Sequence, residues 1–284
     1  MKIDAHTQIC AVLGKPVRHS LSPTIHNAAL QSKGLNMVYV AFEVDDIAQA
    51  VSGMRGLGIR GFSITIPHKV AAMALADEID PVAASIGSIN TLVNTDGVLR
   101  GYNTDGYGAL RAIESAGIKL AGSEVTILGS GGSARAIACT LAAKTDIAKL
   151  TLLGVVEDEM KALTRHVAQI SSAHVEGHMI NDQTIKDALQ HSNLLVNCTP
   201  IGMHPKVDET LVPAQFLGEP MVVFDIVYNP METRLLREAR QAKCRVISGV
   251  EMFIHQAVAQ FELFTGQNAP DNVMRKVVLE SLKF

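Results

Sequence analysis

The first third of the chain holds polar side chains whose types and spacing suit the binding of a small acid and the transfer of a proton. Ser20 and Ser22 stand two residues apart, directly before Pro23 and a predicted helix. Two hydroxyls on one side of an extended segment, beside a helix N-terminus, can hold a carboxylate. The same residues are equally typical of an ordinary helix N-cap followed by proline. Spacing alone favours neither interpretation.

A second group follows an alternating apolar run that stops at a proline. Thr65 and Lys69 flank the end of this run, FSITIPHK, where open α/β sheets gather their ligands. Lys69 is a candidate acid–base group, although a single lysine is most often a solvated surface residue. We interpret the neighbouring His68 as structural, because it must face away from a functional Lys69.

Three more polar residues are candidates for a binding site. Asn90 follows a short Ser-Ile-Gly-Ser-Ile run, Asp105 lies in the turn signature Asn-Thr-Asp-Gly, and Tyr228 comes just past a predicted strand. The alternatives are that Asp105 only forms a turn and that Tyr228 is a half-buried ring with its hydroxyl in water.

A glycine-rich turn between a predicted strand and a predicted helix indicates a dinucleotide site. Its residues fit the pattern G-x-G-x-x-A, in which glycines let a pyrophosphate approach the backbone at a helix N-terminus. The alternative is an ordinary strand-to-helix turn. The residues of this turn are Gly129, Ser130, Gly131, Gly132, Ser133 and Ala134.

The residues after the next predicted strand bear on the choice of dinucleotide. Glu157 and Asp158 follow that strand, and no Arg or Lys appears before Lys161. A carboxylate there can accept from a free ribose 2′-hydroxyl and repels a 2′-phosphate. The alternative is that both acids only favour the first turn of a helix. We therefore expect NAD to be favoured, with NADP possible.

These residues must be positioned by an α/β fold, because short apolar runs alternate with longer helical patterns. A joint near 106–122 predicts two domains: an N-terminal α/β domain of residues 1–107 plus 250–284, and a doubly wound, Rossmann-type dinucleotide-binding domain of residues 108–249. The segment Val250–Phe284 is predicted to be helical and to pack back on the first domain. The expected strands are Ile9–Leu13, Val38–Phe42, Gly61–Ile66, Glu124–Leu128, Lys149–Leu153, Leu194–Cys198, Val222–Ile226 and Arg245–Ser248, and the expected helices include Pro23–Lys33, Ile47–Leu57 and Ser133–Lys144.

Composition excludes several classes of protein. The 284 residues are 48% hydrophobic and carry a formal charge of −3, so a strongly basic nucleic-acid binder is not expected. No apolar run approaches the roughly 18 residues of a membrane span. The four cysteines are far apart and the histidines are scattered, which predicts neither disulfides nor a metal site. We expect a cytoplasmic monomer or homodimer whose partners are small molecules, with no nucleic acid and no membrane.

Taken together, these motifs resemble the shikimate dehydrogenase family, in the family's order and over nearly the whole chain. The resemblance implies a two-domain enzyme that reversibly reduces 3-dehydroshikimate to shikimate, with the substrate on the first domain and a nicotinamide cofactor on the second. The matching motifs are HSLSPTIHN at 19–27, GFSITIPHK at 61–69, GSINTL at 87–92, GYNTDGYG at 101–108, ILGSGGSAR at 127–135, NCTPIGMHP at 197–205, DIVYNP at 225–230 and GVEMFIHQAVAQFELFTGQ at 249–267.

The resemblance also implies a role for individual residues. Lys69 and Asp105 correspond to the catalytic pair, and Ser20 and Ser22 to the residues that hold the carboxylate. The shell around the substrate hydroxyls corresponds to Thr65, Asn90, Asp105 and Gln256, with Tyr228 close by. The cofactor positions correspond to the turn Gly129–Ala134 and to Thr199, Ile201, Met203, Val227 and Gly249.

One departure from the family pattern concerns the cofactor. Members that use NADP typically carry Asn-Arg-Thr after the second nucleotide-domain strand, and Gly154, Val155 and Val156 stand there in this chain. The missing phosphate clamp agrees with the expectation of NAD. Family members that prefer NAD often accept quinate. Ser22, by contrast, keeps the second hydroxyl of the serine pair, which in this family goes with shikimate as the substrate. The alternatives are a quinate/shikimate dehydrogenase, a dehydrogenase of a related cyclic hydroxy acid, or a non-catalytic nucleotide-binding regulator.

Overall fold

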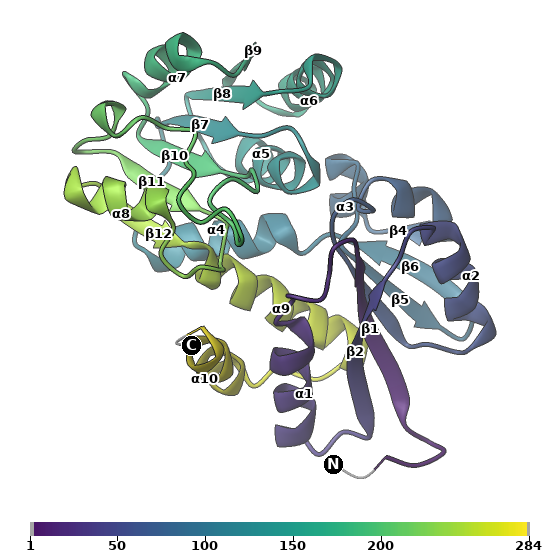
Figure 1. Cartoon of the computed structure of the whole chain (residues 1–284). Coiled ribbons are helices and arrows are strands. Elements are labelled where there is room, and N and C mark those ends of the chain that lie inside the picture. The colour runs from purple at the N-terminus through teal and green to yellow at the C-terminus, as the bar shows by residue number, and fades with distance from the viewer. Residues whose placement is uncertain (1–2, 283–284) are drawn as a thin grey trace. The chain divides into compact units, whose positions relative to one another are not determined.

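The computed structural model describes residues 3–282 and divides the chain into two compact units (Figure 1). Unit 1 comprises residues 1–105 together with 254–284, and unit 2 comprises residues 106–253. In Figure 1, unit 1 runs from purple to blue and resumes in yellow, while unit 2 is teal to green.

Unit 1 is built on a mixed six-stranded sheet in the order β2-β1-β3-β5-β6-β4. Strands β2, β1 and β3 are parallel, whereas β5 pairs antiparallel with both β3 and β6. The strands are β1 (Gln8–Gly14), β2 (Met37–Glu43), β3 (Gly61–Ile64), β4 (Glu78–Ile79), β5 (Thr91–Thr95) and β6 (Val98–Tyr102), and the helices are α1 (Ser22–Ser32), α2 (Ile47–Gly56), α3 (Pro81–Ile86), most of α9 (Gly249–Thr265) and α10 (Asp271–Ser281), with a 3-10 turn at Ala71–Leu75.

Amphipathic spacing explains how α2 covers this sheet. Its buried residues Ile47, Val51 and Met54 fall on one face at helical spacing, and the Asp46 side chain caps the first turn. They join a core with residues of β1, β3, β5 and β6. Helix α1 packs against α10, and Figure 1 shows the two helices beside each other. The C-terminal segment therefore returns to unit 1.

The hairpin formed by β5 and β6 was not among the expected strands. Asp96 and Gly97 connect the two strands, with φ values of 52° and 90°. Two residues at positive φ form the turn that matches the twist of a hairpin, and Asp-Gly is a favoured pair for it. This hairpin makes the sheet mixed and carries Asn90 to the end of β3, since Ile64 N donates to Asn90 O.

Unit 2 is a doubly wound parallel sheet with the order β12-β11-β10-β7-β8-β9. This is the Rossmann order, and the predicted fold class is confirmed. The strands are β7 (Glu124–Leu128), β8 (Lys149–Gly154), β9 (His174–Met179), β10 (Leu194–Asn197), β11 (Val222–Asp225) and β12 (Arg245–Ser248), and the helices are α4 (Asp105–Ser115), α5 (Gly132–Lys144), α6 (Glu157–Ile170), α7 (Asp182–Leu189) and α8 (Arg234–Gln241), with a 3-10 turn at Ala214–Phe216.

The first residue of unit 2 is Gly106, the glycine of the NTDG motif, and its surroundings explain why glycine is needed there. A Cβ at Gly106, at the start of α4, would lie 1.9 Å from Thr140 Oγ1 and 2.8 Å from Ala136 O, both on α5. Only glycine allows α4 and α5 to approach this closely.

Within residues 3–282, no helix is both long enough and apolar enough to cross a membrane.

Candidate active site

The centre of the candidate site in unit 1 is an ion pair between Lys69 and Asp105. Lys69 Nζ donates to Asp105 Oδ2, and the two side chains are only 11% and 6% exposed. The other carboxylate oxygen, Oδ1, accepts from Asn90 Nδ2 at 2.8 Å, while Asp105 N donates to Asn103 Oδ1. A buried charge pair is tolerated when its remaining hydrogen-bonding positions are filled in this way. Sequence reasoning named both members of the pair, and the structure brings them together.

Asn90 fixes the orientation of this pair from the edge of β5. Its Nδ2 donates to Asp105 and to Thr104 Oγ1, and its Oδ1 accepts from Thr104 N at 2.9 Å and from Thr91 Oγ1 at 2.8 Å. Each end of the amide meets groups that only one orientation satisfies. The carboxylate of Asp105 is therefore presented to Lys69 by a rigid neighbour.

The two serines lie together at the start of α1. Ser22 N donates to Ser20 Oγ at 3.2 Å, and the two hydroxyl oxygens are 3.1 Å apart. The last residue before α1 provides no side-chain cap, and no acidic residue stands in the first turn. No acidic side chain of the helix therefore neutralises the positive end of the helix dipole. An unneutralised helix N-terminus favours the binding of a carboxylate.

Thr65 and Gln256 lie on other elements of unit 1. Thr65 N continues the sheet by donating to Leu13 O, and a Cβ at Gly14 would lie 2.3 Å from Thr65 Cγ2. Gly14 thus leaves the space that Thr65 occupies at the end of β3. Gln256 is half-buried on α9, one turn before the fully buried Gln260.

In unit 2, the glycine turn lies where the strand order reverses, between β7 and β10. Gly129 has φ +110°, and a Cβ there would lie 3.2 Å from Cys198 O, in the loop after β10. A Cβ at Gly131 would meet nothing within 4 Å. Gly132 opens α5, whose first turn has neither a side-chain cap nor an acidic residue, and the turn ends at Ala134, which is fully buried. Open space above uncapped helix N–H groups is the arrangement that accepts a pyrophosphate.

The loops after β10 and β11 are held together by Asn197 and Asp225, which sequence reasoning did not single out. Asn197 Oδ1 accepts from Thr199 N and Thr199 Oγ1, and Asn197 Nδ2 donates to Asp225 Oδ1 at 2.9 Å. Asp225 also accepts from Val227 N and from Thr233 Oγ1. Burial raises the pKa of Asp225 to about 6, against the effect of these hydrogen bonds. The available signal was that each polar residue ends an apolar strand.

The remaining cofactor candidates also lie in unit 2, as does Tyr228. Ile201 and Met203 are half-buried in the loop after β10. A Cβ at Gly249 would lie 2.4 Å from Ile226 O and 2.5 Å from Val227 O, so Gly249 lets two backbone segments meet. The ring of Tyr228 stacks on Phe253 with centroids 4.4 Å apart. Tyr228 therefore belongs to the unit that holds the cofactor candidates, whereas the other predicted substrate residues belong to unit 1.

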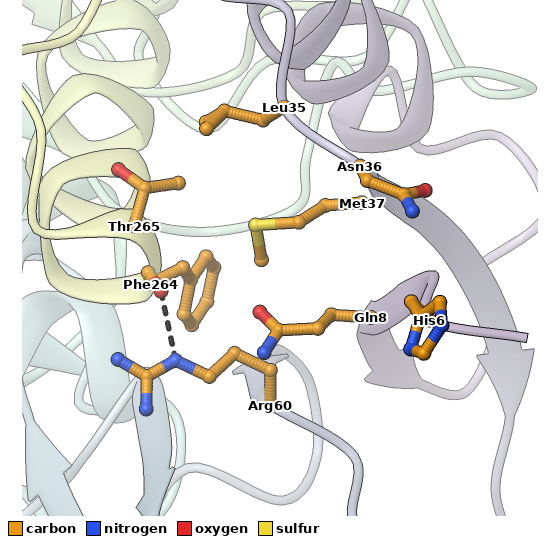
Figure 2. A pocket seen from close by; sticks show the side chains of 8 residues that line it. All are labelled: His6, Gln8, Leu35, Asn36, Met37, Arg60, Phe264 and Thr265. Atoms are coloured by element: carbon orange, nitrogen blue, oxygen red, sulfur yellow. Dashed lines mark hydrogen bonds between the residues drawn. The ribbon is translucent and has the colours of Figure 1, made fainter. Parts of the chain in front are cut away.

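Two other features lie outside these sites. Within residues 3–282, no three His, Cys, Asp or Glu side chains are grouped so that they could hold a metal ion. A pocket of about 440 Å³ in unit 1 is lined by residues that include His6, Gln8, Arg60 and Phe264 (Figure 2). None of the predicted site residues lines this pocket, and Figure 2 shows Arg60 bonded to the Phe264 carbonyl beside it.

Comparison with known proteins connects this geometry to one family of enzymes. The chain is 42% identical to a protein of Moorella thermoacetica named shikimate dehydrogenase (NADP(+)), over 99% of this chain and 96% of that one. A solved shikimate dehydrogenase in complex with NADP+ superimposes with a TM-score of 0.91 at 37% identity, covering 100% of this chain and 98% of that chain. A shikimate 5-dehydrogenase from Listeria monocytogenes, in complex with shikimate and NAD, gives 0.88 at 33% identity, covering 98% of both chains.

The expectation that NAD is favoured is wrong. The Moorella thermoacetica relative and others from Methanosarcina barkeri and Symbiobacterium thermophilum are named for NADP(+), and the solved structure with TM-score 0.91 holds NADP+. The physical reason lies in the first turn of α6. Glu157 pairs with Lys161 at 2.5 Å, and Glu159 accepts from Ser130 Oγ at 3.2 Å. The expectation gave weight to the acidic residues after β8, but Lys161, one turn into the helix, pairs with Glu157 and places a cation beside them.

Models of the family's two end segments match the chain as well. Residues 12–92 match the shikimate dehydrogenase substrate binding domain, and residues 249–279 match the shikimate 5′-dehydrogenase C-terminal domain. With a curated relative at 42% identity that spans nearly the whole chain, these matches extend the motif-based resemblance to the full length of the sequence. The chain belongs to the shikimate dehydrogenase family.

Proposed function

We propose that this chain catalyses the reversible reduction of 3-dehydroshikimate to shikimate with NADPH. The observation that carries this proposal is the buried Lys69–Asp105 pair, held by Asn90 at the end of β3. A buried ammonium fixed by a carboxylate can deliver a proton to a carbonyl oxygen and stabilise the charge that develops there. Membership of the family supplies the substrate class.

In this mechanism Lys69 is the acid–base residue and Asp105 holds it in place. NADPH, when bound, supplies the hydride that the substrate carbonyl carbon receives. Lys69 gives a proton from Nζ to the carbonyl oxygen, so the ketone becomes an alcohol and Lys69 is left as the neutral amine. In the reverse direction the neutral amine takes the hydroxyl proton. Asp105 keeps its hydrogen bonds throughout, since its Oδ1 remains bound to Asn90.

The other unit 1 candidates position the substrate. Ser20 and Ser22 would hold the carboxylate at the uncapped N-terminus of α1, where both the hydroxyls and the helix dipole favour a negative charge. Thr65, just after β3, Asn90, just before β5, and Gln256 on α9 would contact the ring hydroxyls. Tyr228 would add a further contact.

Unit 2 would hold the cofactor, and its residues fit that role. The turn Gly129–Ala134 would take the pyrophosphate, because Gly131 faces open space and α5 begins without a side-chain cap. Glu157 and Asp158 stand after β8, beside the expected position of the adenosine ribose. The nicotinamide would lie against loops that Asp225 and Gly249 hold in place, through residues Thr199, Ile201, Met203, Val227 and Gly249.

The assignment of unit 1 to the substrate and unit 2 to the cofactor is part of this proposal, as is a cytoplasmic location. Cys10, Cys139 and Cys244 are buried thiols outside any disulfide. Thiols of this kind are usual in proteins of a reducing compartment.

Initial rates with two substrates and two cofactors test the proposed function. Shikimate and quinate are each oxidised with NADP+ and with NAD+ at one alkaline pH, and absorbance of the reduced nicotinamide is followed. We expect the fastest turnover with shikimate and NADP+. Faster turnover of quinate would overturn the substrate, and faster turnover with NAD+ would overturn the cofactor. Bound NADP+ without turnover in any combination would overturn the activity itself.

A further inference from the structure

A fully buried glutamine on α9 joins two strands of the unit 1 sheet by hydrogen bonds. Gln260 is 2% exposed. Its Oε1 accepts from Ser63 Oγ on β3 at 2.8 Å, and its Nε2 donates to Thr91 Oγ1 at 2.9 Å and to Asn90 O at 3.1 Å. Both donors of the carboxamide and its acceptor are therefore satisfied, and the amide can take only one orientation.

The hydrogen bonds continue from Ser63 to a buried tyrosine on β2. Tyr39 is 2% exposed, and its hydroxyl donates to Ser63 Oγ at 2.6 Å. Its ring stacks on His26 of α1, with centroids 4.3 Å apart and planes 7° apart. Burial raises the pKa of the Tyr39 phenol above its usual value, with Ser63 and Ser22 acting in the opposite direction. Tyr39 therefore stays a neutral donor, and its stacking on His26, one turn after Ser22 on α1, places it against the part of the helix that carries the serine pair.

Donors and acceptors in this series follow one direction. Ser63 accepts from Tyr39, so its own proton is available for Gln260. Thr91 accepts from Gln260 and donates to Asn90 Oδ1 at 2.8 Å. Asn90 then donates to Asp105, the partner of Lys69. We call the residues Tyr39, Ser63, Gln260, Thr91, Asn90 and Asp105 the buried polar chain.

The helix that carries Gln260 is fixed against the sheet one turn further on. A Cβ at Gly61 would lie 2.3 Å from the Phe264 ring, so the ring lies directly against the first residue of β3. Arg60 Nε donates to Phe264 O at 2.9 Å, as Figure 2 shows, and Arg60 Nη1 donates to Asn94 O at 2.7 Å. The register of α9 on β3 and β5 is thereby set, and Gln260 cannot move away from the strands.

We propose that Tyr39 and Gln260 are positioning residues that, through the buried polar chain, hold the serine pair and the Lys69–Asp105 pair in one fixed arrangement. This inference rests on the proposed function for its catalytic consequence. Gln260 orients the Asn90 amide through Thr91 and the Asn90 carbonyl, and that amide presents Asp105 to Lys69. Tyr39 supports the other end, where its ring stacks on His26 one turn after Ser22. Buried networks of this kind are rigid only when every member is satisfied.

Replacing Gln260 by glutamate tests the catalytic end. In Gln260→Glu an ionised carboxylate has no proton to donate, so it repels Asn90 O and draws the Thr91 hydroxyl proton away from Asn90 Oδ1. We expect kcat to fall at least tenfold at pH 8, with the KM for shikimate changed less than threefold. Burial raises the pKa of a carboxyl group, and its protonated form regains a donor. The ratio of variant to wild-type kcat should therefore rise as the pH falls toward 6.

The titratable groups that face this position do not obscure that profile. They are His26 from α1, Tyr39 from β2 and, beside Tyr39, Cys10 from β1. Burial lowers the pKa of His26 to about 3, raises that of Cys10 to about 12 and raises that of Tyr39, so all three stay neutral over the measured range. A kcat ratio near one, or a reduced ratio that is constant with pH, would overturn the proposal.

Replacing Tyr39 by phenylalanine tests the other end. Tyr39→Phe keeps the ring and its stacking on His26 but removes the hydroxyl that bonds Ser63. We expect the KM for shikimate to rise about fivefold or more while kcat falls less than threefold, the reverse of the pattern for Gln260→Glu. Unchanged KM would overturn the role of Tyr39. Phe261→Leu is the control, since Phe261 is buried on the same helix and is no member of the chain; it should lower stability and leave both constants within twofold.

A measurement without turnover separates this inference from the proposed function. Lys69 and the exposed Lys33 are acetylated with acetic anhydride and quantified by mass spectrometry in the wild type and Gln260→Glu. Loss of the Asp105 contact should raise the labelling of Lys69 relative to Lys33 at least threefold. Equal relative labelling in the two proteins would overturn the buried polar chain, even if wild-type turnover supports the proposed function. A wild type without activity would overturn only the proposed function.

Discussion

The candidate site of unit 1 consists of side chains, whereas that of unit 2 consists mostly of backbone groups. In unit 1, the functional candidates are side chains that bury one another, with Lys69, Asp105 and Asn90 joined by short hydrogen bonds. In unit 2, they are mostly backbone: a glycine that faces open space, a helix without a side-chain cap, and a glycine where two segments touch. A site for chemistry needs fixed charges, whereas a site for a phosphate needs room and unsatisfied N–H groups.

The largest expected effect comes from removing the charge at the centre of unit 1. Lys69→Ala should lower turnover of shikimate by roughly 10²–10⁴-fold, the usual contribution of acid–base catalysis. Binding of NADPH, followed by its fluorescence, should be unchanged because unit 2 is intact. Lys33→Ala, at an exposed site of unit 1, is the control. Near-normal turnover in a folded Lys69→Ala protein would refute the assignment.

The next effect concerns the one charged group that unit 2 does bury. The folded pKa of Asp225 is about 6 against an ordinary value of 3.8. A raised folded pKa means stability that is present below about pH 4 and lost as the pH rises through 6. Asp225→Asn removes this loss, so its free energy of unfolding relative to wild type should improve by up to about 3 kcal/mol between pH 4 and pH 7.5.

Denaturant unfolding at several pH values measures that difference. Gln190→Ala, at an exposed position of the same unit, removes no titratable group and should differ from wild type by a constant amount over the same range. A constant difference for Asp225→Asn as well would mean that Asp225 has the same pKa in the folded and unfolded chains. Asp225 would then hold the loops after β10 and β11 without any loss of unfolding free energy from burying its charge.

A smaller effect is expected where backbone meets backbone. Gly249→Ala would place a Cβ 2.4 Å from Ile226 O, so one segment must shift. We expect a loss of about 1–3 kcal/mol in unfolding free energy, typical of overpacking, and a raised KM for NADP+. Gly218→Ala is the matched control because a Cβ there meets nothing within 4 Å. Equal stability of the two variants would contradict the close approach.

The smallest effect is expected at the glycine turn of unit 2. Gly131→Ala fills space that is open in the structure, so the variant should keep wild-type stability. Its affinity for NADP+ should fall about tenfold, or 1.4 kcal/mol, because the methyl group takes the place of the pyrophosphate. Calorimetric titration and thermal unfolding give the two numbers. Wild-type affinity would show that the cofactor does not approach this turn.

Much of unit 2 was predictable because its pattern is local. Apolar strands alternate with helices, and the predicted strands Glu124–Leu128 and Arg245–Ser248 coincide with β7 and β12. In unit 1, the hairpin of β5 and β6 was missed although Asp96-Gly97 is a strong turn signal. Its strands follow a short helix rather than a long one, so the alternation of strand and helix gave no indication of them.

The polar contacts of the candidate site were less predictable. Lys69, Asp105 and Asn90 were named from motifs, but Tyr39, Ser63 and Gln260 were not. Ser63 and Gln260 are 197 positions apart in sequence, and nothing local distinguishes a buried serine from an exposed one. The cofactor expectation failed for the same reason, since residue types after β8 do not reveal which charges are paired.

The discontinuity of unit 1 has a consequence for how the chain is made on the ribosome. Unit 2 is a continuous stretch and can fold as soon as residue 253 has emerged, since domains form as units during synthesis. The sheet of unit 1 emerges first, yet it lacks Gln260, the Phe264 ring that covers Gly61, and the partner of α1 until α9 and α10 have left the exit tunnel. The nascent chain therefore carries a β-sheet without its covering helices α9 and α10 through most of its translation. That sheet is the part of the protein most exposed to chaperones and to aggregation.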